Sequence, residues 1–307
     1  MLYGETRNCT VPIRLITVSC ALLLAAGLFT AASFAQAPPS YLPQEMDKMV
    51  SRIALYPDPL LAQILTASTY PNDIPAAAQW ANQHHYLTGD ALAGAITADQ
   101  LPWDPSVQAL LPFPSVLDMM ASDMSWTQEL GNAVLGQRPE VMDAVQRMRR
   151  QAVDFGYLRT NPAVGIGMGP YITIMPANPA FIVVPVYDPI VVFARPRPGF
   201  FVGGAIRFGF GINIGLVFQP WGWGVSRFDW GAHTVIINNA PWGRTWANRA
   251  TYVHPYTVRR YAPTAPRSAE RHEIHDRSER EREAPRTGRP SREEHDRGRG
   301  RKRDDQR

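Results

Sequence analysis

Apolar side chains between residues 43 and 158 recur every three or four positions, in short runs separated by prolines. This spacing places them along one face of a helix. The clearest run extends from Pro139 to Phe155 and is followed by Gly156, a residue suited to the left-handed position after a helix. We therefore predict a compact N-terminal domain of short helices over residues 43–158. The apolar stripe of that run is Val141, Val145, Met148, Ala152 and Phe155, and the polar residues predicted to lie off it are Gln146, Arg147, Arg149, Arg150 and Asp154.

Aspartate–proline pairs mark the starts of two of these helices. Asp58 and Asp104 each precede a proline, an order that combines a capping carboxylate with a residue that suits the first helical position. A further short helix is predicted from Pro114 to Met120, and Asp123 is a candidate cap for the helix after it. Helix starts so closely spaced favour a compact, irregular α-domain over a long bundle.

The periodicity changes after the helical domain, where β-branched residues become frequent. Residues 171–175 and 181–184 are β-branched runs separated by a segment with two prolines, which is typical of strand–turn–strand. Residues 186–193 continue the β pattern, and residues 234–237 predict another strand, followed by an Asn-Asn turn. We therefore predict a β-rich region with many glycines and tryptophans over residues 165–258, and an α+β fold for the chain.

Residues 200–218 form a long apolar stretch of this region and allow two interpretations. Large apolar residues occupy every even position except Gly204, whereas glycine, alanine, arginine and asparagine occupy the odd positions from 203 to 215. This period of two favours a long bent strand, or a hairpin that turns near residues 209–211. A membrane-spanning helix is the alternative. It would place Arg207 in hydrocarbon at a cost of about 3 kcal/mol, and it would contain several glycines, which are weak helix formers.

Residues 1–35 have the order of a secretory signal peptide. Arg7 and Arg14 precede an uncharged apolar run over residues 15–32, which ends in small residues suited to cleavage after Ala35. An uncleaved anchor is the alternative, since the run is about long enough to span a bilayer. We therefore predict an exported protein that is periplasmic or associated with a membrane of the cell envelope.

Both cysteines of the chain, Cys9 and Cys20, lie within this predicted leader. A chain cleaved after Ala35 contains no thiol, which excludes disulfides, thiol catalysis and cysteine-ligated metal clusters. Any chemistry of the exported chain would therefore depend on its acids, histidines and aromatic side chains.

Positive charge is concentrated at the C-terminus. Residues 259–307 contain 16 of the 31 Lys and Arg and 11 of the 27 Asp and Glu, a net of +5 in a chain whose formal net charge is +4. This segment has almost no large apolar residues, so we predict a disordered, Arg-rich tail. Its charge suits anionic lipid headgroups or wall polymers. Export and the interspersed acids argue against nucleic acid as a partner.

Five carboxylates of the helical domain are candidates for an acid–base pair of the kind that cleaves glycans. Helix capping already accounts for three of them, which favours a structural role for the acids and a protein without catalytic activity. An envelope hydrolase acting on peptidoglycan or another glycan is the alternative. The five candidate acids are Asp58, Asp104, Asp118, Asp123 and Glu129.

No cofactor or metal is predicted from the histidines or glycines. His84 and His85 are adjacent, so on a helix they point about 100° apart and do not form a ligand pair. His272 and His275 have a closer spacing, but they lie in the predicted disordered tail. The glycines at 165–169 are followed by a proline and a predicted strand, whereas a dinucleotide-binding loop needs a helix there.

Five of the eight tryptophans lie between residues 219 and 258, among many glycines. If they are exposed on a β-surface, their rings can stack on sugar rings or peptides. The interpretation that we favour is that they fill the β-core, where the neighbouring glycines leave room for them. The candidate ligand-binding residues are Trp221, Trp223, Trp230 and Trp242.

Seven motifs follow one another along residues 43–193. They are Ile53–Leu65, Ala67–Pro71, Pro102–Val107, Phe113–Met120, Trp126–Gly131, Val141–Gln146 and Val184–Pro189. Together they resemble the bacterial DUF3300 family, a domain of unknown function. The resemblance implies an exported or membrane-associated protein with a hydrophobic segment. It implies no activity and assigns no catalytic residue.

The function we predict is that of an exported cell-envelope protein without enzymatic activity, which has a structural or binding role at the membrane or wall surface. Two alternatives stay open: an envelope hydrolase that uses the carboxylates, and an integral membrane protein that spans the bilayer at residues 200–218. The three differ in what they demand of the fold, namely exposed binding groups, two acids in one cleft, or a long apolar helix.

Overall fold

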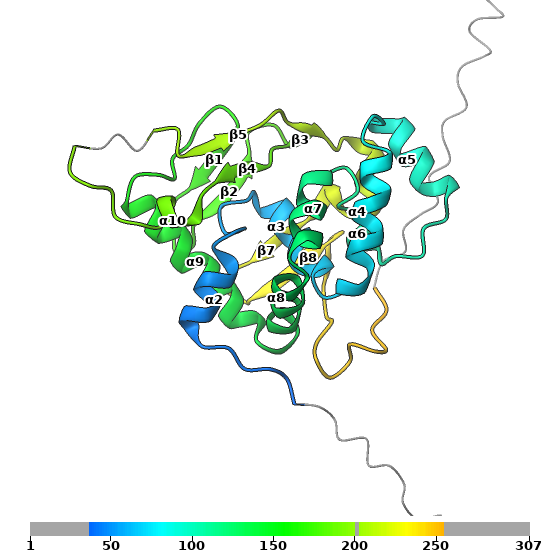
Figure 1. Cartoon of the computed structure of the whole chain (residues 1–307), viewed down its shortest axis with the longest axis horizontal. Helices are drawn as coiled ribbons and strands as arrows, with labels where there is room; N and C mark the ends of the chain where they lie inside the picture. The colour runs from blue at the N-terminus through cyan, green and yellow to red at the C-terminus, as the bar shows by residue number, and fades with distance from the viewer. Residues whose placement is uncertain (1–36, 200–202, 255–307) are drawn as a thin grey trace, which may run out of the picture. The chain divides into compact units, whose positions relative to one another are not determined.

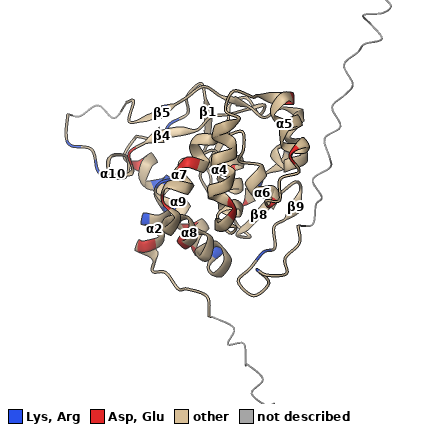
Figure 2. Cartoon of the chain, turned by 45° about the vertical axis from the view of Figure 1, so that its right-hand side comes forward, with Lys and Arg blue, Asp and Glu red and all other residues tan. Residues whose placement is uncertain are grey.

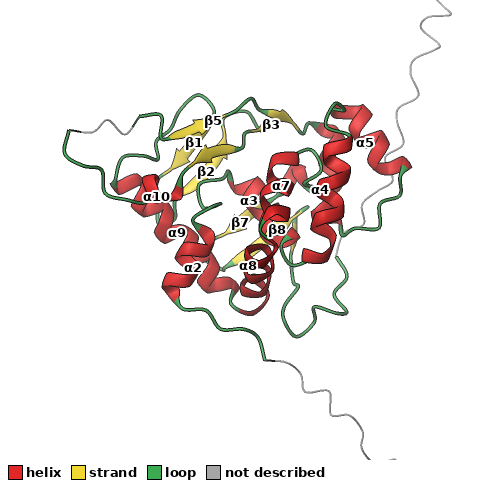
Figure 3. Cartoon of the chain, viewed as in Figure 1, coloured by secondary structure: helices red, strands yellow, loops and turns green. Residues whose placement is uncertain are grey.

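The computed structural model describes residues 37–199 and 203–254 (Figure 1). The predicted signal peptide and the predicted Arg-rich tail lie outside the described residues, as do residues 200–202. Helices and several short antiparallel sheets make up the described part of the chain (Figure 3), which confirms the α+β class.

Short helices form the first part of the chain, and most begin with a proline in the first turn. Proline suits this position because the N–H that it lacks would have no partner inside the helix. The helices predicted over 114–120 and 139–155 are confirmed, and Gly156 adopts a left-handed φ of +77°. The elements are α2 (Pro43–Val50), α3 (Asp58–Ala67), the 3-10 helix η1 (Pro71–Asp73), α4 (Ile74–Gln83), α5 (Gly89–Ala98), α6 (Pro105–Gln108), α7 (Pro114–Ser122), α8 (Met124–Gly136) and α9 (Arg138–Asp154).

Four small antiparallel sheets account for the described strands. The strands predicted over 171–175 and 181–184 both form, but they do not pair with each other. The first pairs instead with the strand that precedes it, residues 164–167, and the second pairs with residues 212–213. The sheets are β1 (Val164–Gly167) with β2 (Thr173–Pro176), β3 (Phe181–Ile182) with β6 (Ile212–Asn213), β4 (Pro185–Tyr187) with β5 (Ile206–Phe208), and the order β7 (Arg227–Asp229), β8 (Thr234–Ile237), β9 (Ala240–Pro241).

A short helix, α10 (Pro189–Val192), interrupts the β pattern predicted over residues 186–193. Asp188 caps it, since its carboxylate accepts a hydrogen bond from the backbone N–H of Ile190 at 2.8 Å. The aspartate–proline order that starts helices earlier in the chain therefore starts one here as well, against the β propensity of the three residues that follow.

Residues 203–218 do not form a helix that spans this stretch. They contain β5, β6 and the start of a 3-10 helix, η2 (Leu216–Trp221). The prediction of strand is confirmed for the described part of this segment, and the alternative of a spanning helix is wrong there. Among the helices of the described residues, none combines the length and apolar composition needed to cross a membrane.

The hairpin predicted near residues 209–211 is also wrong, since β5 and β6 do not pair with each other. They run back along β4 and then β3. Two residues separate β3 from β4, whereas three separate β5 from β6, so the second strand bulges by one residue. Phe210, in the middle of this bulge, is fully exposed.

The predicted Asn-Asn turn is confirmed between β8 and β9. Asn238 and Asn239 have φ values of +51° and +63°. Positive φ at both central residues is the geometry of the tight turn that matches the twist of two antiparallel strands, and asparagine tolerates it better than most residues.

Helix α3 lies at the centre of the fold, and all ten of its residues are buried (Figure 1). Helices α6 and α8 pack against it, and so do β2, β7 and β8 from the later part of the chain. A helix that is covered on every side belongs to a core. The main cluster of buried apolar side chains accordingly contains residues of the helices and of β7 and β8 together.

Two polar residues of α9 are buried although they were predicted to lie off its apolar stripe. Gln146 is 6% exposed and Arg149 is fully buried. The segment that leads into β2 packs on this face of α9, and both side chains bind the backbone of Ile172: its N–H donates to Gln146 Oε1 at 2.8 Å, and its carbonyl accepts from Arg149 Nη1 at 2.8 Å. The buried face is therefore wider than the apolar stripe, because an incoming backbone needs hydrogen-bond partners.

Candidate functional site

All four candidate tryptophans are buried, with exposed fractions between 1% and 6%. This burial agrees with the favoured interpretation that the tryptophans fill a core, and no ring offers a free face for stacking on a sugar or peptide. Two of the indole N–H groups reach the helical region instead. Trp221 Nε1 donates to Gln108 Oε1 at 3.0 Å, and Trp223 Nε1 donates to the Ala109 carbonyl at 2.8 Å.

The other two tryptophans contact charged side chains. Trp230 Nε1 donates to Asp58 Oδ2 at 3.4 Å, and the guanidinium carbon of Arg149 lies 5.1 Å from its ring centre. The guanidinium carbon of Arg138 lies 4.7 Å from the ring centre of Trp242, and its Nη1 donates to the Trp242 carbonyl at 3.1 Å. Cation–π contacts of this kind add to the burial that holds the aromatic residues on the helices.

Asp58 is not a helix cap, contrary to the prediction. Pro57 occupies the cap position of α3 and no side-chain cap bond forms. Asp58 Oδ1 instead lies 2.6 Å from Arg149 Nη1, in an ion pair whose side chains are 4% and 0% exposed. The carboxylate turns inward because buried donors surround it, including the backbone N–H of Ile174 at 3.3 Å.

The Arg149 guanidinium also satisfies three backbone carbonyls. Nε donates to Ala54 at 2.8 Å, Nη1 to Ile172 at 2.8 Å and Nη2 to Tyr56 at 3.1 Å. One fully buried cation thus joins α9, the connection between α2 and α3, and the segment before β2. A buried charge is tolerated only when its donors are satisfied and it is paired, and both conditions hold here.

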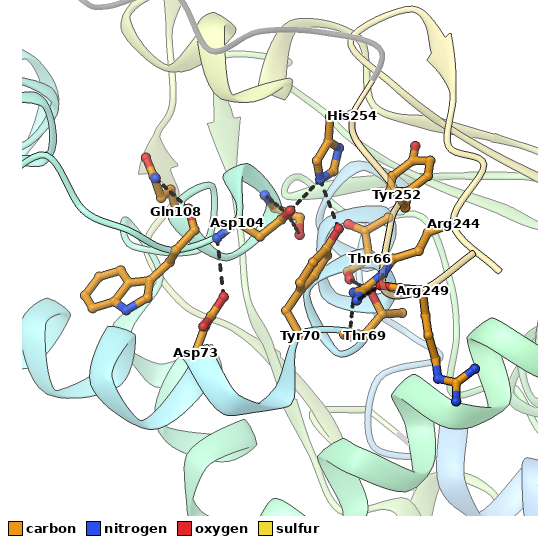
Figure 4. Close-up of polar contacts among 12 residues, drawn as sticks. Thr66, Thr69, Tyr70, Asp73, Asp104, Gln108, Arg244, Arg249, Tyr252 and His254 are labelled. Carbon is orange, nitrogen blue, oxygen red and sulfur yellow. Dashed lines mark hydrogen bonds and ion pairs between the residues drawn. The ribbon is translucent and has the colours of Figure 1, made fainter. Parts of the chain in front are cut away.

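Asp104 caps α6, as predicted, and also has a partner that sequence reasoning missed. Its Oδ1 accepts a hydrogen bond from the Ser106 N–H at 2.9 Å. Its Oδ2 lies 2.6 Å from His254 Nε2, and the two side chains are 10% and 8% exposed (Figure 4). Asp104 and His254 are 150 positions apart, so no local spacing in the sequence could have indicated their pairing.

His254 ends the described part of a segment that we call the C-terminal strap, residues 242–254. The strap converges on Tyr70 from the helical region (Figure 4). The guanidinium carbon of Arg244 lies 3.6 Å from the Tyr70 ring centre, and its Nη1 donates to the Thr69 carbonyl at 2.6 Å. The Tyr70 hydroxyl lies 3.4 Å from His254 Nε2. Sequence reasoning did not single out Tyr70 or Arg244 either.

Burial and charge set the protonation of this cluster. Burial raises the pKa of Asp104, but the hydrogen bond and charge of His254, together with the bonds from Ser106, outweigh it and leave this pKa below its ordinary value. Burial, reinforced by the charge of Asp104, raises the pKa of Tyr70 far above its ordinary value, so the hydroxyl keeps its proton at neutral pH. The carboxylate and imidazole face each other inside the joint between strap and helices, an arrangement that fastens the strap.

Two of the five candidate acids, Asp123 and Glu129, line a hollow of about 690 Å³ together with Arg52 and Trp126. Asp123 caps α8 by accepting the Trp126 N–H at 3.1 Å, and it pairs with Arg52 at 2.9 Å. The hydrogen bond from Trp126 and the contact with Arg52 hold the pKa of Asp123 below its ordinary value. An acid of this kind suits the role of base or nucleophile, and not that of proton donor. The other three candidate acids do not line this hollow.

The remaining sequence candidates lie apart from these groups. His84 stacks on Trp80 with ring centres 3.9 Å apart, at the end of α4, and His85 is exposed. Residues 165–169 form most of β1 and the turn after it, and no helix follows. The two tail histidines lie outside the described residues. Within residues 37–199 and 203–254, no three His, Cys, Asp or Glu side chains group as a metal site.

The chain belongs to the DUF3300 family. The family model, described as a protein of unknown function, matches residues 42–259, so the family region includes the C-terminal strap as well as the motifs of the helical region. The uncharacterized protein YacH of Escherichia coli (strain K12) is 31% identical over 269 residues, which covers 70% of this chain and 43% of that relative. The chain therefore spans less than half the length of that curated relative. No solved structure matches the chain.

Proposed function

We propose that this DUF3300 protein is exported to the cell envelope, periplasmic or associated with a membrane, and has a structural or binding role there and not a catalytic one. The partners of its carboxylates support the proposal that the role is not catalytic. Asp58 is paired with the buried guanidinium of Arg149, Asp104 binds the buried imidazole of His254, and Asp123 joins a helix start to Arg52. A catalytic carboxylate needs a face directed at a substrate. The apolar leader with small residues before Ala35 supports export.

The proposed partner is an anionic envelope surface, made of lipid headgroups or wall polymers, which the Arg-rich tail contacts. Residues 259–307 carry a net charge of +5, and arginine binds phosphate and carboxylate groups in bidentate fashion. Each basic residue near an anionic membrane surface contributes about 1 kcal/mol. Nucleic acid is not proposed, because export separates the chain from it.

Cell fractionation with N-terminal sequencing tests this proposal. Cells would express the full chain with a small C-terminal tag, and envelope fractions would be washed with salt. We expect a new N-terminus at Gln36, and retention in the envelope fraction that weakens as salt screens the arginines. An unprocessed chain recovered in the cytoplasm would contradict export. A processed chain that is free in the periplasm at low salt would contradict the role of the tail.

A second candidate function is glycan hydrolysis, which one observation favours: Asp123 and Glu129 line the same hollow beside Trp126. Two carboxylates on either side of a glycosidic bond, with an aromatic wall, are the elements of a glycosidase. Release of soluble fragments from purified peptidoglycan would be measured with Asp123→Asn and Glu129→Gln. The matched control is Asp118→Asn, an exposed acid outside the hollow. Turnover that both variants lose and the control keeps would replace the non-catalytic proposal.

A further inference from the structure

Exposed apolar side chains are distributed unevenly over the described residues. Up to residue 158 only Leu42 and Tyr86 are both large and apolar and well exposed, whereas residues 168–216 contain nine such side chains. Single exposed apolar residues are ordinary in any protein, but several on one element indicate a surface that binds something.

Three of the nine gather around α10, at one end of the described part of the chain. We call this set, with the neighbouring arginines, the α10 surface: Val186, Ile190, Val191, Arg195, Arg197 and Arg207. Ile190 is 83% exposed and Val186 is 54% exposed. Val186 lies directly opposite Arg207 in the β4–β5 ladder, so their side chains stand next to each other on the exposed face.

Two of the arginines, Arg195 and Arg197, follow α10 directly in the chain. Residues 194–199 leave α10 at the same end and project from the body of the molecule in both views (Figures 1 and 2). Arg195 and Arg197 are both exposed residues of this segment.

Hydrogen bonds on both sides of α10 hold this helix in place, so the exposure of Ile190 is a property of the fold. The Tyr187 hydroxyl donates to the Ser51 carbonyl at 2.8 Å, just before the helix. Gln151 Nε2 of α9 donates to the Phe193 carbonyl at 2.6 Å, just after it. Val192 is fully buried between these anchors. A helix that is pinned on both sides while two aliphatic side chains point outward presents those side chains at little entropic cost.

The charge along this segment indicates its partner. Residues 186–207 contain three arginines and a single acid, Asp188, whose carboxylate caps α10. Ile190 also borders the hollow described above, where Glu45, Asp123 and Glu129 outnumber Lys48 and Arg52, so the positive charge lies on the side of the surface formed by Val186 and Arg207. Positive charge beside aliphatic side chains matches the interface of an anionic bilayer, where hydrocarbon accepts the aliphatic groups and lipid phosphates accept guanidinium. A wall polymer offers anionic groups but no hydrocarbon in which to bury Ile190.

We propose that the α10 surface docks on an anionic lipid bilayer, with Ile190 and Val191 entering the boundary between headgroups and acyl chains. The proposal rests on the proposed envelope function, since the chain must reach a membrane surface, and it adds a contact made by the folded part to the one made by the tail. Two weak membrane contacts on one chain bind far more tightly than either alone.

Site-specific fluorescence tests insertion. A chain that starts at Gln36 has no cysteine, so Ile190→Cys introduces a single labelling site. Labelled with a polarity-sensitive dye, it should shift to shorter wavelength on vesicles of phosphatidylcholine with phosphatidylglycerol, and not on phosphatidylcholine alone. Tyr86→Cys is the matched control, since Tyr86 is 69% exposed on the helical region and should report water in both cases. Equal spectra at the two positions on the anionic vesicles would overturn the proposal.

Vesicle binding separates the α10 surface from the tail. We expect Ile190→Ser with Val191→Ser to weaken binding of the chain to the anionic vesicles about tenfold, from the loss of buried aliphatic surface. Arg195→Ser with Arg197→Ser should weaken it by about tenfold as well. Substitution of Arg299, Arg301, Lys302 and Arg303 by serine tests the tail separately.

Each outcome decides a different point. Binding that only the tail substitutions reduce overturns the α10 surface and leaves the proposed function standing. Absence of binding by the unsubstituted chain to both the anionic vesicles and purified wall polymer contradicts the two proposals together. Binding to wall polymer that the α10 substitutions leave unchanged, with none to vesicles, also overturns the bilayer as the partner of this surface. Circular dichroism should show that every variant is folded, as expected for exposed positions.

Discussion

The helical region (residues 43–154) and the β-rich region (residues 164–254) bury their apolar side chains to different degrees. Helices satisfy their own backbone hydrogen bonds and pack around α3, so few large apolar residues reach solvent. The strands are two to four residues long and form separate small sheets, which cannot cover both of their faces. Two-stranded sheets are marginal on their own, so the β-rich region must rely on the helices for its core.

The contacts between the two regions show how this reliance works. Trp221 and Trp223 bury their rings against the helices and donate to groups of the helical region. The Tyr187 hydroxyl binds a carbonyl between α2 and α3. Arg149 binds carbonyls of both regions. The helical region supplies the rigid frame, and the β-rich region is left with exposed apolar groups that are available for binding.

The largest expected effect on this comparison follows from removing the buried cation. Arg149→Met leaves the Asp58 carboxylate buried without a cationic partner and removes the hydrogen bonds that Arg149 donates to three carbonyls. We expect the free energy of unfolding to fall by about 3–5 kcal/mol. Urea denaturation followed by tryptophan fluorescence measures it, because Trp230 lies beside this ion pair.

The control for this substitution is Arg147→Met on the same helix. Arg147 pairs with Asp47 at 2.7 Å, but both side chains are partly exposed, at 45% and 31%. An exposed pair contributes at most about 1 kcal/mol. Equal losses from the two substitutions would show that the buried pair has no special part in joining the regions.

The next largest effects come from two glycine-to-alanine substitutions that should change stability in opposite directions. Both test packing inside the helical region alone. A Cβ at Gly131 of α8 would lie 2.1 Å from the Ser68 carbonyl oxygen, so Gly131→Ala must push α8 away from the end of α3. We expect a loss of about 1–3 kcal/mol. Gly94→Ala on α5 meets no atom within 4 Å and should stabilise the protein by about 0.5–1 kcal/mol, since alanine favours helix. Thermal unfolding of both variants checks the expected difference in sign.

The smallest effect concerns the strap and depends on pH. The pKa of Asp104 is lower in the folded chain than its ordinary value of 3.8, so its contribution to stability is fully present above that value and is lost as pH falls through the folded pKa. We expect Asp104→Asn to lose about 1–2 kcal/mol at pH 7 and to show a shallower decline below about pH 4. Denaturation midpoints measured from pH 7 to pH 3 test both.

Asp118→Asn serves as the control for that titration, because Asp118 is an exposed acid whose hydrogen bond, to Asn82 at 2.6 Å, is also exposed. It should change stability by at most about 0.5 kcal/mol at any of these pH values. A parallel acid limb in Asp104→Asn and in the unsubstituted chain would show that the pair with His254 does not hold the strap.

Several elements with a local signal in the sequence were predicted correctly, although the aspartate–proline starts at Asp58 and Asp188 were misjudged. Pro114, Asp104 and Gly156 act through neighbouring backbone groups, and the Asn-Asn turn needs only its own two φ angles, so adjacent residues suffice to indicate them. Strand partners were not predicted: β5 and β6 pair with β4 and β3, and not with each other. Pairing depends on which edge another segment reaches first, and that is a property of the whole chain.

The residues of the candidate site also differ in whether their role depends on neighbouring residues or on distant ones. The acids were recognised as caps where capping is local, as for Asp104 and Asp123, but Asp58 faces the interior because Arg149, 91 positions later, supplies the charge that it needs. A core position was the favoured interpretation for the tryptophans, but their partners on the helices could not be derived from spacing. His254 had no local signal at all.

Local sequence patterns were enough to indicate the starts of α6, α7 and α9, the β-rich character of the later region, the distribution of apolar and charged residues, and the family that the chain resembles. These properties arise from interactions over a few residues, which composition and spacing record directly. The identity of the buried polar groups, their partners and the apolar side chains that remain exposed became apparent from the folded chain alone. All of these depend on contacts between segments far apart in the chain, where the cost of burying an unpaired charge selects one arrangement.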